Sequence, residues 1–302
     1  MTLPTLWAVS DLHVRHADNR AVVEGLRPRS AADWLIVAGD VGERVEDVAW
    51  ALGLLRERFT RVLWVPGNHE LWTRSKDPVP LRGEARYRHL VETCRALDVL
   101  TPEDPYPVWD GPVWDGPGGP AVVAPLFLLY DYSVLAAGAR TPDEGLAAAY
   151  RAGVVCTDEY LLHPDPHPSR AAWCAARVAA TGRRLDALDP DLPTVLVNHW
   201  PLTPLPTRVL RHQEFSIWCG TTATGDWHVR YRAAAVVYGH LHIPRVTFED
   251  GVRFVEASLG YPREWRAREE RFGTPVSALL PRQVLPAPGG RPARGGPAAV
   301  RT

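Results

Sequence analysis

The sequence has almost no lysine and no excess of charge of either sign. Lys76 is the only lysine among the 302 residues, and the formal net charge is -1 at pH 7. Without a basic field over the whole chain, nothing in its charge argues for nucleic acid as the main partner. The other basic side chains are nearly all arginine, which we attribute, together with the abundant alanine, proline and glycine, to a GC-rich genome.

Cysteine is scarce, and long apolar runs are absent. The four cysteines form no C-x-x-C pair and are Cys94, Cys156, Cys174 and Cys219. Scattered cysteines without a secretory context indicate unpaired thiols in a reducing compartment. The N-terminal residues show no basic region ahead of a long apolar one, and no apolar run reaches the length of a membrane span. We therefore expect a soluble cytoplasmic protein without a membrane partner.

The overall composition is that of an ordinary globular protein. Hydrophobic residues make up 46% and charged residues 23%, and the length allows one large α/β domain or two small ones. Strand-like runs such as "TLWAVS" and "DWLIVAGD" alternate with amphipathic segments such as "RVEDVAWALGLLRERF" through the first hundred residues. This alternation predicts βαβ units with largely parallel strands.

The rest of the chain is less regular. Residues 102–120 are dense in proline and glycine, which predicts an irregular surface loop, and residues 142–168 resemble a helical insertion. The last stretch, "PAPGGRPARGGPAAVRT", has too few apolar side chains to bury a core. We therefore predict one domain over residues 1–279 and a disordered tail rich in Pro, Gly and Arg over residues 280–302.

Polar side chains follow several of the predicted strands at the point where each strand ends. They are Asp11, His13, Asp40, Asn68, His69, His199, His240 and His242. In open α/β sheets, ligands bind outside the carboxyl ends of the strands, because the loops there converge on one crevice. The spacing from Asp11 to Asp40 is 29 positions and from Asp40 to Asn68 is 28, each about one βαβ unit. We expect these side chains to meet at one place.

The residue types in this set predict a particular chemistry. Oxygen and imidazole ligands without thiolate suit Mn, Fe or Zn and do not suit a structural zinc finger. Seven ligands are too many for one tetrahedral ion, but they fit two ions that share a carboxylate. Two-metal sites clamp the attacking and leaving oxygens of an in-line displacement at phosphorus. The set therefore predicts hydrolysis of a phosphoester.

The same residues carry a resemblance to a known family. The segments "DLH", "GD", "GNHE", "NH" and "GHLH" stand in this order between residues 11 and 242 and resemble the five motifs of the calcineurin-like metallophosphoesterases. Each motif alone is a weak signal, whereas five in order, each after a strand, are a specific one. The resemblance implies an α/β fold, a four-layer sandwich of two mixed β-sheets flanked by helices.

The resemblance also implies a role for each site residue. One metal is held by Asp11, His13, Asp40 and His242, and the second by Asp40, Asn68, His199 and His240. His69 would steady the transition state or protonate the leaving oxygen. The cofactors would be two divalent or mixed-valence ions of Mn, Fe or Zn, with Mn favoured. A helix cap at Asp11 and a core histidine at His199 are the alternatives, which the five ordered motifs disfavour.

Further segments resemble a narrower group. "FSIWCGTTAT", "VYGHLHIPR" and "GYPREWR" are similar to a bacterial subgroup that includes phosphopantetheinyl hydrolases, which remove the 4'-phosphopantetheine arm from holo acyl carrier proteins. This resemblance implies a holo acyl carrier protein phosphodiesterase, with an acidic carrier protein as partner. It would also give a use to the arginines of "YPREWRAREERFG", whose alternative is an ordinary solvated helix face.

Other functions stay open at this stage. The same metal site also suits a phosphoesterase acting on a nucleotide, a cyclic nucleotide or another small phosphodiester. A DNA exonuclease is disfavoured because no basic domain follows the core, and a non-catalytic interaction module would not need to keep all the ligands. The aromatic residues between 200 and 231 fit either a lid over the metals or a satellite core beneath a long loop.

Overall fold

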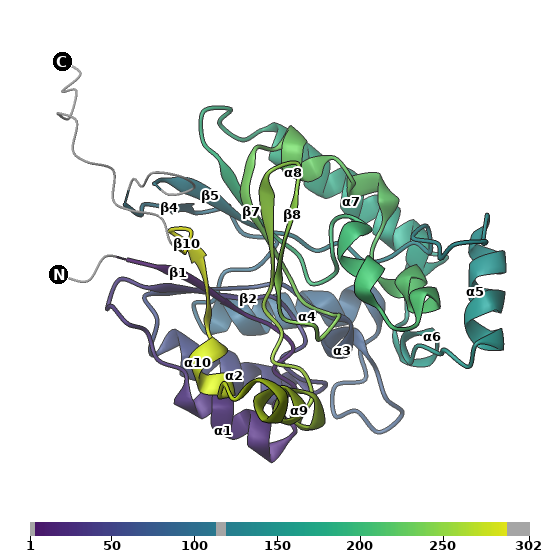
Figure 1. The fold of residues 1–302 in the computed structure, drawn as a ribbon, viewed down its shortest axis with the longest axis horizontal. Coiled ribbons are helices and arrows are strands. Elements are labelled where there is room, and N and C mark those ends of the chain that lie inside the picture. The colour runs from purple at the N-terminus through teal and green to yellow at the C-terminus, as the bar shows by residue number, and fades with distance from the viewer. Residues whose placement is uncertain (1–3, 113–118, 289–302) are drawn as a thin grey trace.

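The computed structural model describes residues 4–112 and 119–288, which form two β-sheets between outer layers of helices (Figure 1). Within these ranges one sheet has the strand order β10-β1-β2-β3, with bounds Arg282–Leu285, Leu6–Val9, Trp34–Val37 and Arg61–Trp64. The other has the order β4-β5-β6-β7-β9-β8, with bounds Val108–Trp109, Ala121–Pro125, Thr194–Val197, Ala233–Tyr238, Val252–Glu256 and Val246–Glu249. The neighbours among β1, β2 and β3, and among β5, β6, β7 and β9, pair in parallel, as the alternating sequence predicted. Antiparallel β10, β4 and β8 make both sheets mixed.

The core lies in three layers because successive side chains of a strand point to opposite faces. The layer between the sheets is made of small and branched side chains, including Leu6, Ala8, Ile36, Leu63, Val123, Val195, Ala235 and Val237. On the outer face of the first sheet, Trp7 and Leu35 pack in one cluster with Leu52 of α2 (Val45–Arg56) and Leu90 of α4 (Gly83–Ala96). The prediction of a four-layer sandwich is therefore confirmed on this side.

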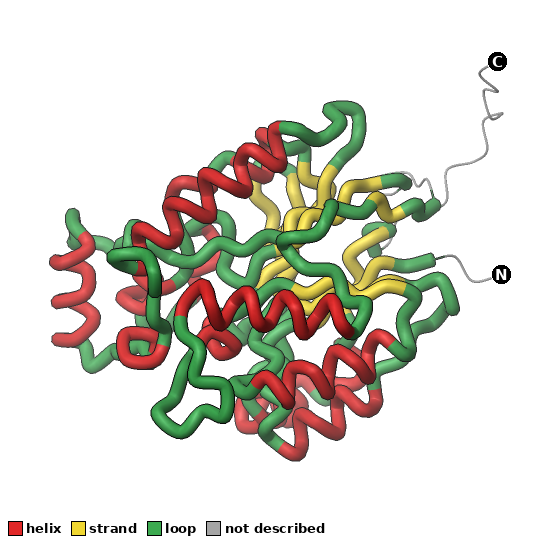
Figure 2. The backbone as a smooth tube through the Cα atoms, turned by 180° about the vertical axis from the view of Figure 1, so that it is seen from behind, coloured by secondary structure: helices red, strands yellow, loops and turns green. Residues whose placement is uncertain are grey.

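The second sheet is covered in the same way. Leu196 and Val236 pack with Leu185 of α7 (Arg170–Asp186) and with Trp227, the first residue of α8 (Trp227–Arg230). Figure 2 shows the strands lying between the helices of the two outer layers. The fourth layer of the predicted sandwich is therefore also present.

The remaining helices fall into two sets. Below the sheets in Figure 1, α1 (Ala17–Gly25), α9 (Pro262–Phe272) and α10 (Val276–Leu279) join α2 in the outer layer. The other set lies in the segments that follow β3, β5 and β6. After β3 comes α3 (Asn68–Leu71), and after β5 come α5 (Pro142–Arg151) and α6 (Asp158–Leu161). After β6 come the 3-10 helices η1 (Leu205–Val209), η2 (Gln213–Trp218) and η3 (Thr222–Thr224). The predicted helical insertion at residues 142–168 corresponds to α5 and α6, and α5 packs against η2.

Two segments predicted to be irregular contain strands. Inside the loop of residues 102–120, β4 pairs with β5 and its Trp109 is buried. Near the C-terminus, β10 pairs with β1 and completely buries Val284 and Leu285, each worth about 1.5–3 kcal/mol of stabilisation. The predicted domain boundary at residue 279 is therefore too early, since the domain continues at least to the end of β10. The rest of the predicted tail, residues 289–302, lies outside the described residues.

Two further expectations concern the environment of the chain. The four cysteines are all free and buried, in keeping with the predicted unpaired thiols. Within residues 4–112 and 119–288, no helix has the length and apolar character needed to cross a membrane.

Candidate metal centre

The carboxyl ends of β1, β2, β3, β6 and β7 converge on one place between the two sheets. All eight predicted site residues follow these strands within a few positions and are buried or nearly so. A bridge between Ser10 and Ser258 and hydrogen bonds between the loops join the two sheets here. The structure thus brings together every residue that the sequence singled out for the site.

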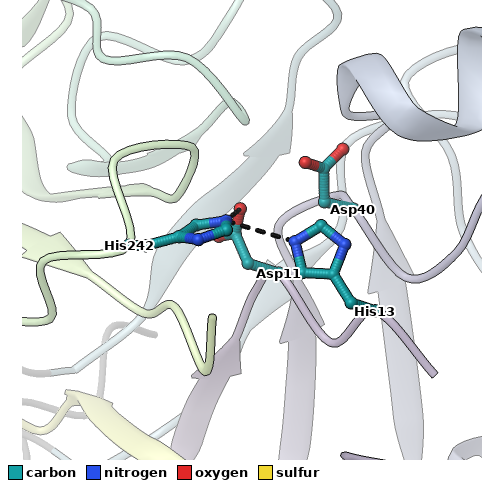
Figure 3. Close-up of side chains that lie close together, drawn as sticks. All are labelled: Asp11, His13, Asp40 and His242. Carbon is teal, nitrogen blue, oxygen red and sulfur yellow. Dashed lines mark hydrogen bonds and ion pairs between the residues drawn. The ribbon is translucent and has the colours of Figure 1, made fainter. Parts of the chain in front are cut away.

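One group of four side chains forms the first half of the centre (Figure 3). Its ligand atoms lie within 4.8 Å of one another and belong to Asp11, His13, Asp40 and His242. Nε2 of His242 lies 3.1 Å from Oδ1 of Asp11 and 3.1 Å from Nε2 of His13. These are the four residues that the resemblance assigned to one metal.

A second group adjoins the first through Asp40. Oδ1 of Asn68 lies 3.2 Å from Nε2 of His199 and 3.3 Å from Nδ1 of His240. Oδ2 of Asp40 lies 3.4 Å from the same His199 nitrogen. Asp40 therefore contacts both groups, which is the position expected of a carboxylate shared by two ions.

The hydrogen bonds of two histidines fix which ring nitrogen faces the centre. Nδ1 of His199 lies 2.8 Å from the carbonyl oxygen of Ala38, and Nδ1 of His242 lies 2.8 Å from the carboxylate of Glu264. Both partners only accept, so each Nδ1 carries a hydrogen and each Nε2 turns a lone pair toward the centre when the ring is neutral. In His240 it is Nδ1 that faces the centre, 3.3 Å from Oδ1 of Asn68, whereas Nε2 is buried without a hydrogen-bond partner among the described residues. Nitrogen lone pairs aimed at oxygen atoms fit the binding of metal cations.

The electrostatics of the centre agree with this fit. Burial and repulsion from His199 lower the pKa of His240 to about 3, so this ring is neutral at pH 7, as a metal-binding imidazole must be. Burial also opposes charge on His242, but attraction by Asp11 and Glu264 raises the pKa of His242 to about 10. The carboxylates therefore attract positive charge to the place where the ligand atoms meet.

The backbone of the centre is strained. Five of the site residues adopt positive φ although none is glycine: Asp11 at 52°, His13 at 41°, Asp40 at 53°, His240 at 71° and His242 at 56°. Such conformations cost on the order of 1–3 kcal/mol each and persist where the surrounding structure imposes them, often at functional sites. Here they turn side chains from successive strand ends toward one point.

Glycines in the motifs allow the close approach of the loops. A Cβ atom at Gly67 would lie 2.1 Å from Oδ1 of Asp40, and one at Gly239 would lie 2.3 Å from Oδ2 of Asp11. Any side chain at these positions would collide with a carboxylate of the centre. The glycines of "GNHE" and "GHLH" are therefore part of the construction of the site.

Glu70, the last residue of "GNHE", is one of several site residues that the sequence analysis did not assign. Its buried carboxylate accepts hydrogen bonds from the backbone nitrogens of Asp40 at 3.0 Å, Val41 at 2.8 Å and Gly67 at 3.0 Å. Burial and repulsion from Asp40 raise the pKa of Glu70 to about 7. Glu70 thus fastens two of the site loops to each other, and its place in the motif was the signal that could have found it.

The other unassigned residues contact the centre from outside the five motifs. Oγ of Ser258 donates to Asp11 at 2.6 Å, and Glu264 accepts from His242. Asp158 of α6 accepts from Nδ2 of Asn68 at 2.9 Å. Nothing in the sequence distinguishes Ser258 and Asp158 from other polar residues, whereas Glu264 stands in the segment "GYPREWR", whose resemblance to a narrower group was the signal that could have found it.

His69 faces the centre beside these groups. Its Nε2 lies 3.8 Å from Oδ2 of Asp40, and its Nδ1 lies 3.7 Å from Oε1 of Glu43. Its backbone nitrogen donates to Oδ1 of Asp40 at 2.9 Å, which anchors the residue to the shared carboxylate. The imidazole is therefore held between two carboxylates at the edge of the ligand groups.

The aromatic segment between residues 200 and 231 packs mainly in the core and also contacts the centre. Trp200 and Trp218 are completely buried in the core, as a satellite core requires. Phe215 is only partly buried and stacks on His240 with ring centroids 5.8 Å apart. The segment is therefore packed core that also forms one wall of the centre.

Comparisons with known proteins agree with this geometry. The family model described as calcineurin-like phosphoesterase matches residues 4–244. The chain is 58% identical over 285 residues to the [acyl-carrier-protein] phosphodiesterase PptH of Mycobacterium tuberculosis, covering 94% of this chain and 84% of that protein. The crystal structure of phosphopantetheinyl hydrolase from the same organism superposes with a TM-score of 0.89 at 57% identity, covering 95% of this chain and 97% of that one. Matched over most of its length and with its motif residues gathered at the strand ends, the chain belongs to the calcineurin-like phosphoesterase family.

Proposed function

We propose that the chain is a phosphodiesterase with two metal ions that releases 4'-phosphopantetheine from a holo acyl carrier protein. The observation that carries this proposal is the 58% identity, over 94% of the chain, to an acyl-carrier-protein phosphodiesterase. The convergence of all eight predicted residues at the strand ends supports it, because a non-catalytic module would have no need of the complete set.

The proposed ligands follow the two groups of the centre. Asp11, His13, Asp40 and His242 would hold one ion, and Asp40, Asn68, His199 and His240 the other. Oxygen and imidazole donors suit Mn, Fe or Zn, and among them we favour Mn. When bound, the ions supply Lewis acidity toward the phosphoryl oxygens and lower the pKa of water.

The protein side chains would orient the ester and supply a proton. We assign to His69 the protonation of the leaving serine oxygen, since its Nε2 faces the centre while Glu43 lies at Nδ1 on the opposite side of the ring. Burial opposes charge on His69, but Asp40 and Glu43 raise its pKa and favour the imidazolium, which carries a hydrogen on both nitrogens and can donate Nε2–H to the substrate. The serine side chain of the carrier would then leave as a neutral hydroxyl.

The surface beside His69 carries several positive charges, which supports an acidic partner. Arg15 and Arg74 contact Glu43 at 3.4 Å and 2.8 Å, and about half of each side chain is exposed. Arg263 is exposed and lies over the ring of Tyr261 at 5.9 Å. Positive side chains on a surface attract negatively charged partners and speed their association. An acidic carrier protein fits this surface, and nucleic acid is not proposed.

We also propose that the enzyme works in the cytoplasm. All four cysteines are free and buried. Free thiols are the usual state in a reducing cytoplasm, where disulfides are rare.

Mass spectrometry of a holo carrier protein incubated with the enzyme and Mn tests the proposed reaction. We expect the carrier to lose the whole arm, which leaves the apo protein with its serine intact and free 4'-phosphopantetheine in solution. The same incubation with Asp40→Asn is the control for contaminating hydrolases. An intact carrier, combined with rapid cleavage of a nucleotide or cyclic-nucleotide diester, would show that the substrate is a small phosphodiester instead.

A second prediction concerns Asp158, which orients the amide of Asn68. Its Oδ1 accepts from Asn68 at 2.9 Å and from the indole nitrogen of Trp72 at 2.6 Å, so the amide oxygen is turned toward His199 and His240. Groups that orient metal ligands are typically worth about 10-fold to 100-fold in metal affinity. We expect Asp158→Ala to weaken one of the two ions by this factor, measured by metal titration.

The matched control for Asp158→Ala is Asp143→Ala, because Asp143 lies in the same helical insertion and is exposed. It should bind both ions like the wild type. Equal weakening of both ions by Asp158→Ala, or no weakening, would contradict the assigned role.

A further inference from the structure

Tyr261 reaches the centre from outside the region matched by the family model, which ends at residue 244. Its ring stacks on His13 with centroids 4.5 Å apart and meets His242 edge-on at 5.0 Å. Its hydroxyl lies 3.5 Å from Nε2 of His69. The side chain is partly exposed, so it borders both the ligand groups and the solvent.

The position of Tyr261 is fixed by α9, which begins at the next residue. The backbone nitrogen of Tyr261 donates to Oε2 of Glu264 at 2.8 Å, the same oxygen that lies 2.8 Å from Nδ1 of His242. The helix is anchored below by buried Trp265, whose indole nitrogen donates to Asn19 at 2.8 Å. These contacts hold Tyr261 in a fixed position relative to His242 of the metal centre.

The hydroxyl of Tyr261 is available to a substrate. Among the described residues the hydroxyl faces the His69 nitrogen, and their separation of 3.5 Å is longer than an ordinary hydrogen bond. A phenol O–H and an imidazole N–H at this separation reach the same small region of space. A phosphoester bound there would meet two donors, one from each side chain.

We propose that Tyr261 is a catalytic residue whose hydroxyl donates a hydrogen bond to a non-bridging oxygen of the phosphodiester. In the reaction the oxygen of water bonds to phosphorus, the bond from phosphorus to the ester oxygen breaks, and the leaving oxygen takes a proton. Tyr261 keeps its own proton and stabilises negative charge on the phosphoryl oxygens in the transition state. The inference rests on the phosphodiesterase activity proposed above, and it does not depend on which alcohol leaves.

Tyr261→Phe tests this role because phenylalanine keeps the ring that stacks on His13 and removes only the hydroxyl. The probes are bis(4-nitrophenyl) phosphate and holo carrier protein, each with Mn. Loss of one such donor typically costs about 10²-fold to 10³-fold in kcat. We expect a loss of this size, with unchanged KM, metal content and thermal unfolding. Because the donor acts on a non-bridging oxygen, the loss should be similar for both esters.

The matched control is Tyr160→Phe, which removes a hydroxyl from a side chain that is 72% exposed. It should behave as the wild type. Wild-type kcat in Tyr261→Phe, or a loss that follows reduced metal content, would overturn the proposal and leave Tyr261 a packing residue. If the wild type cleaves only bis(4-nitrophenyl) phosphate, the proposed carrier-protein substrate is wrong. The comparison of the wild type with Tyr261→Phe on this ester then still tests the role of Tyr261. A wild type that cleaves neither ester would overturn both.

Discussion

Asp40→Asn should lose both metal ions and nearly all activity. Oδ2 of Asp40 faces His199 at 3.4 Å, and the residue also belongs to the group that contains Asp11, His13 and His242. Asparagine has nearly the same shape, and its oxygen can still accept from the backbone nitrogen of His69. The substitution therefore removes the negative charge and one ligand oxygen while the fold is kept. Metal ions contribute several kcal/mol to such transition states, so we expect a loss of about 10³-fold or more.

Metal analysis of the purified variant, followed by rate measurements with added Mn, checks this prediction. The matched control is Asp189→Asn, an exposed residue whose side-chain oxygen accepts from the backbone of Asp191, as asparagine also can. It should keep both ions and the full rate. Retention of one ion at full occupancy in Asp40→Asn would show that this carboxylate is not shared. Full activity of the wild type in a strong chelator would remove the metal mechanism altogether.

The main lines of the fold and the metal centre could be predicted because both follow from local patterns. Short apolar runs separated by amphipathic segments define parallel strands, and the carboxyl ends of parallel strands meet. A polar residue just after such a run, such as Asp11 or Asp40, is therefore placed in the site by its position in the sequence. The resemblance of the five motifs then implied the roles that we propose for the individual residues.

The supporting residues could not be predicted because their positions depend on contacts between distant segments. Asp158 approaches Asn68 only after the insertion packs against the chain that follows β3, where Trp72 pairs with Leu162. Ser258 and Tyr261 reach the centre through the bridge between the sheets and the start of α9. Acidic and hydroxyl residues occur throughout the sequence, and nothing local separates Asp158 and Ser258 from the others. Tyr261 stands in the segment "GYPREWR", but the resemblance of that segment did not indicate that its tyrosine reaches the centre.

The misplaced domain boundary has a similar cause. The four residues of β10 stand next to a segment rich in proline and glycine, whose composition suggested a tail. Their partner is β1, at the other end of the chain, and the pairing buries Val284 and Leu285. A strand this short is stabilised by non-local packing and not by its own propensity, so composition is a poor guide to it.

His69→Ala should separate chemistry from metal binding. The side chain lies 3.8 Å from Asp40 but is not one of the proposed ligands, and alanine keeps the backbone N–H that donates to Asp40. We therefore expect the variant to fold and to hold both ions. General acids contribute about 10²-fold to 10⁴-fold, so the rate should fall by that factor on an ester with a poor leaving group.

The leaving group distinguishes a general acid from a purely electrostatic role at His69. An alkoxide such as that of serine needs a proton as it departs, whereas a nitrophenolate is stable without one. The loss in His69→Ala should therefore be large for holo carrier protein and small for bis(4-nitrophenyl) phosphate, while Tyr261→Phe affects both alike. The exposed His212→Ala, with no side-chain cap bond to lose, is the control and should change neither rate. An equal loss on the two esters would show that His69 does not transfer the proton and only stabilises charge.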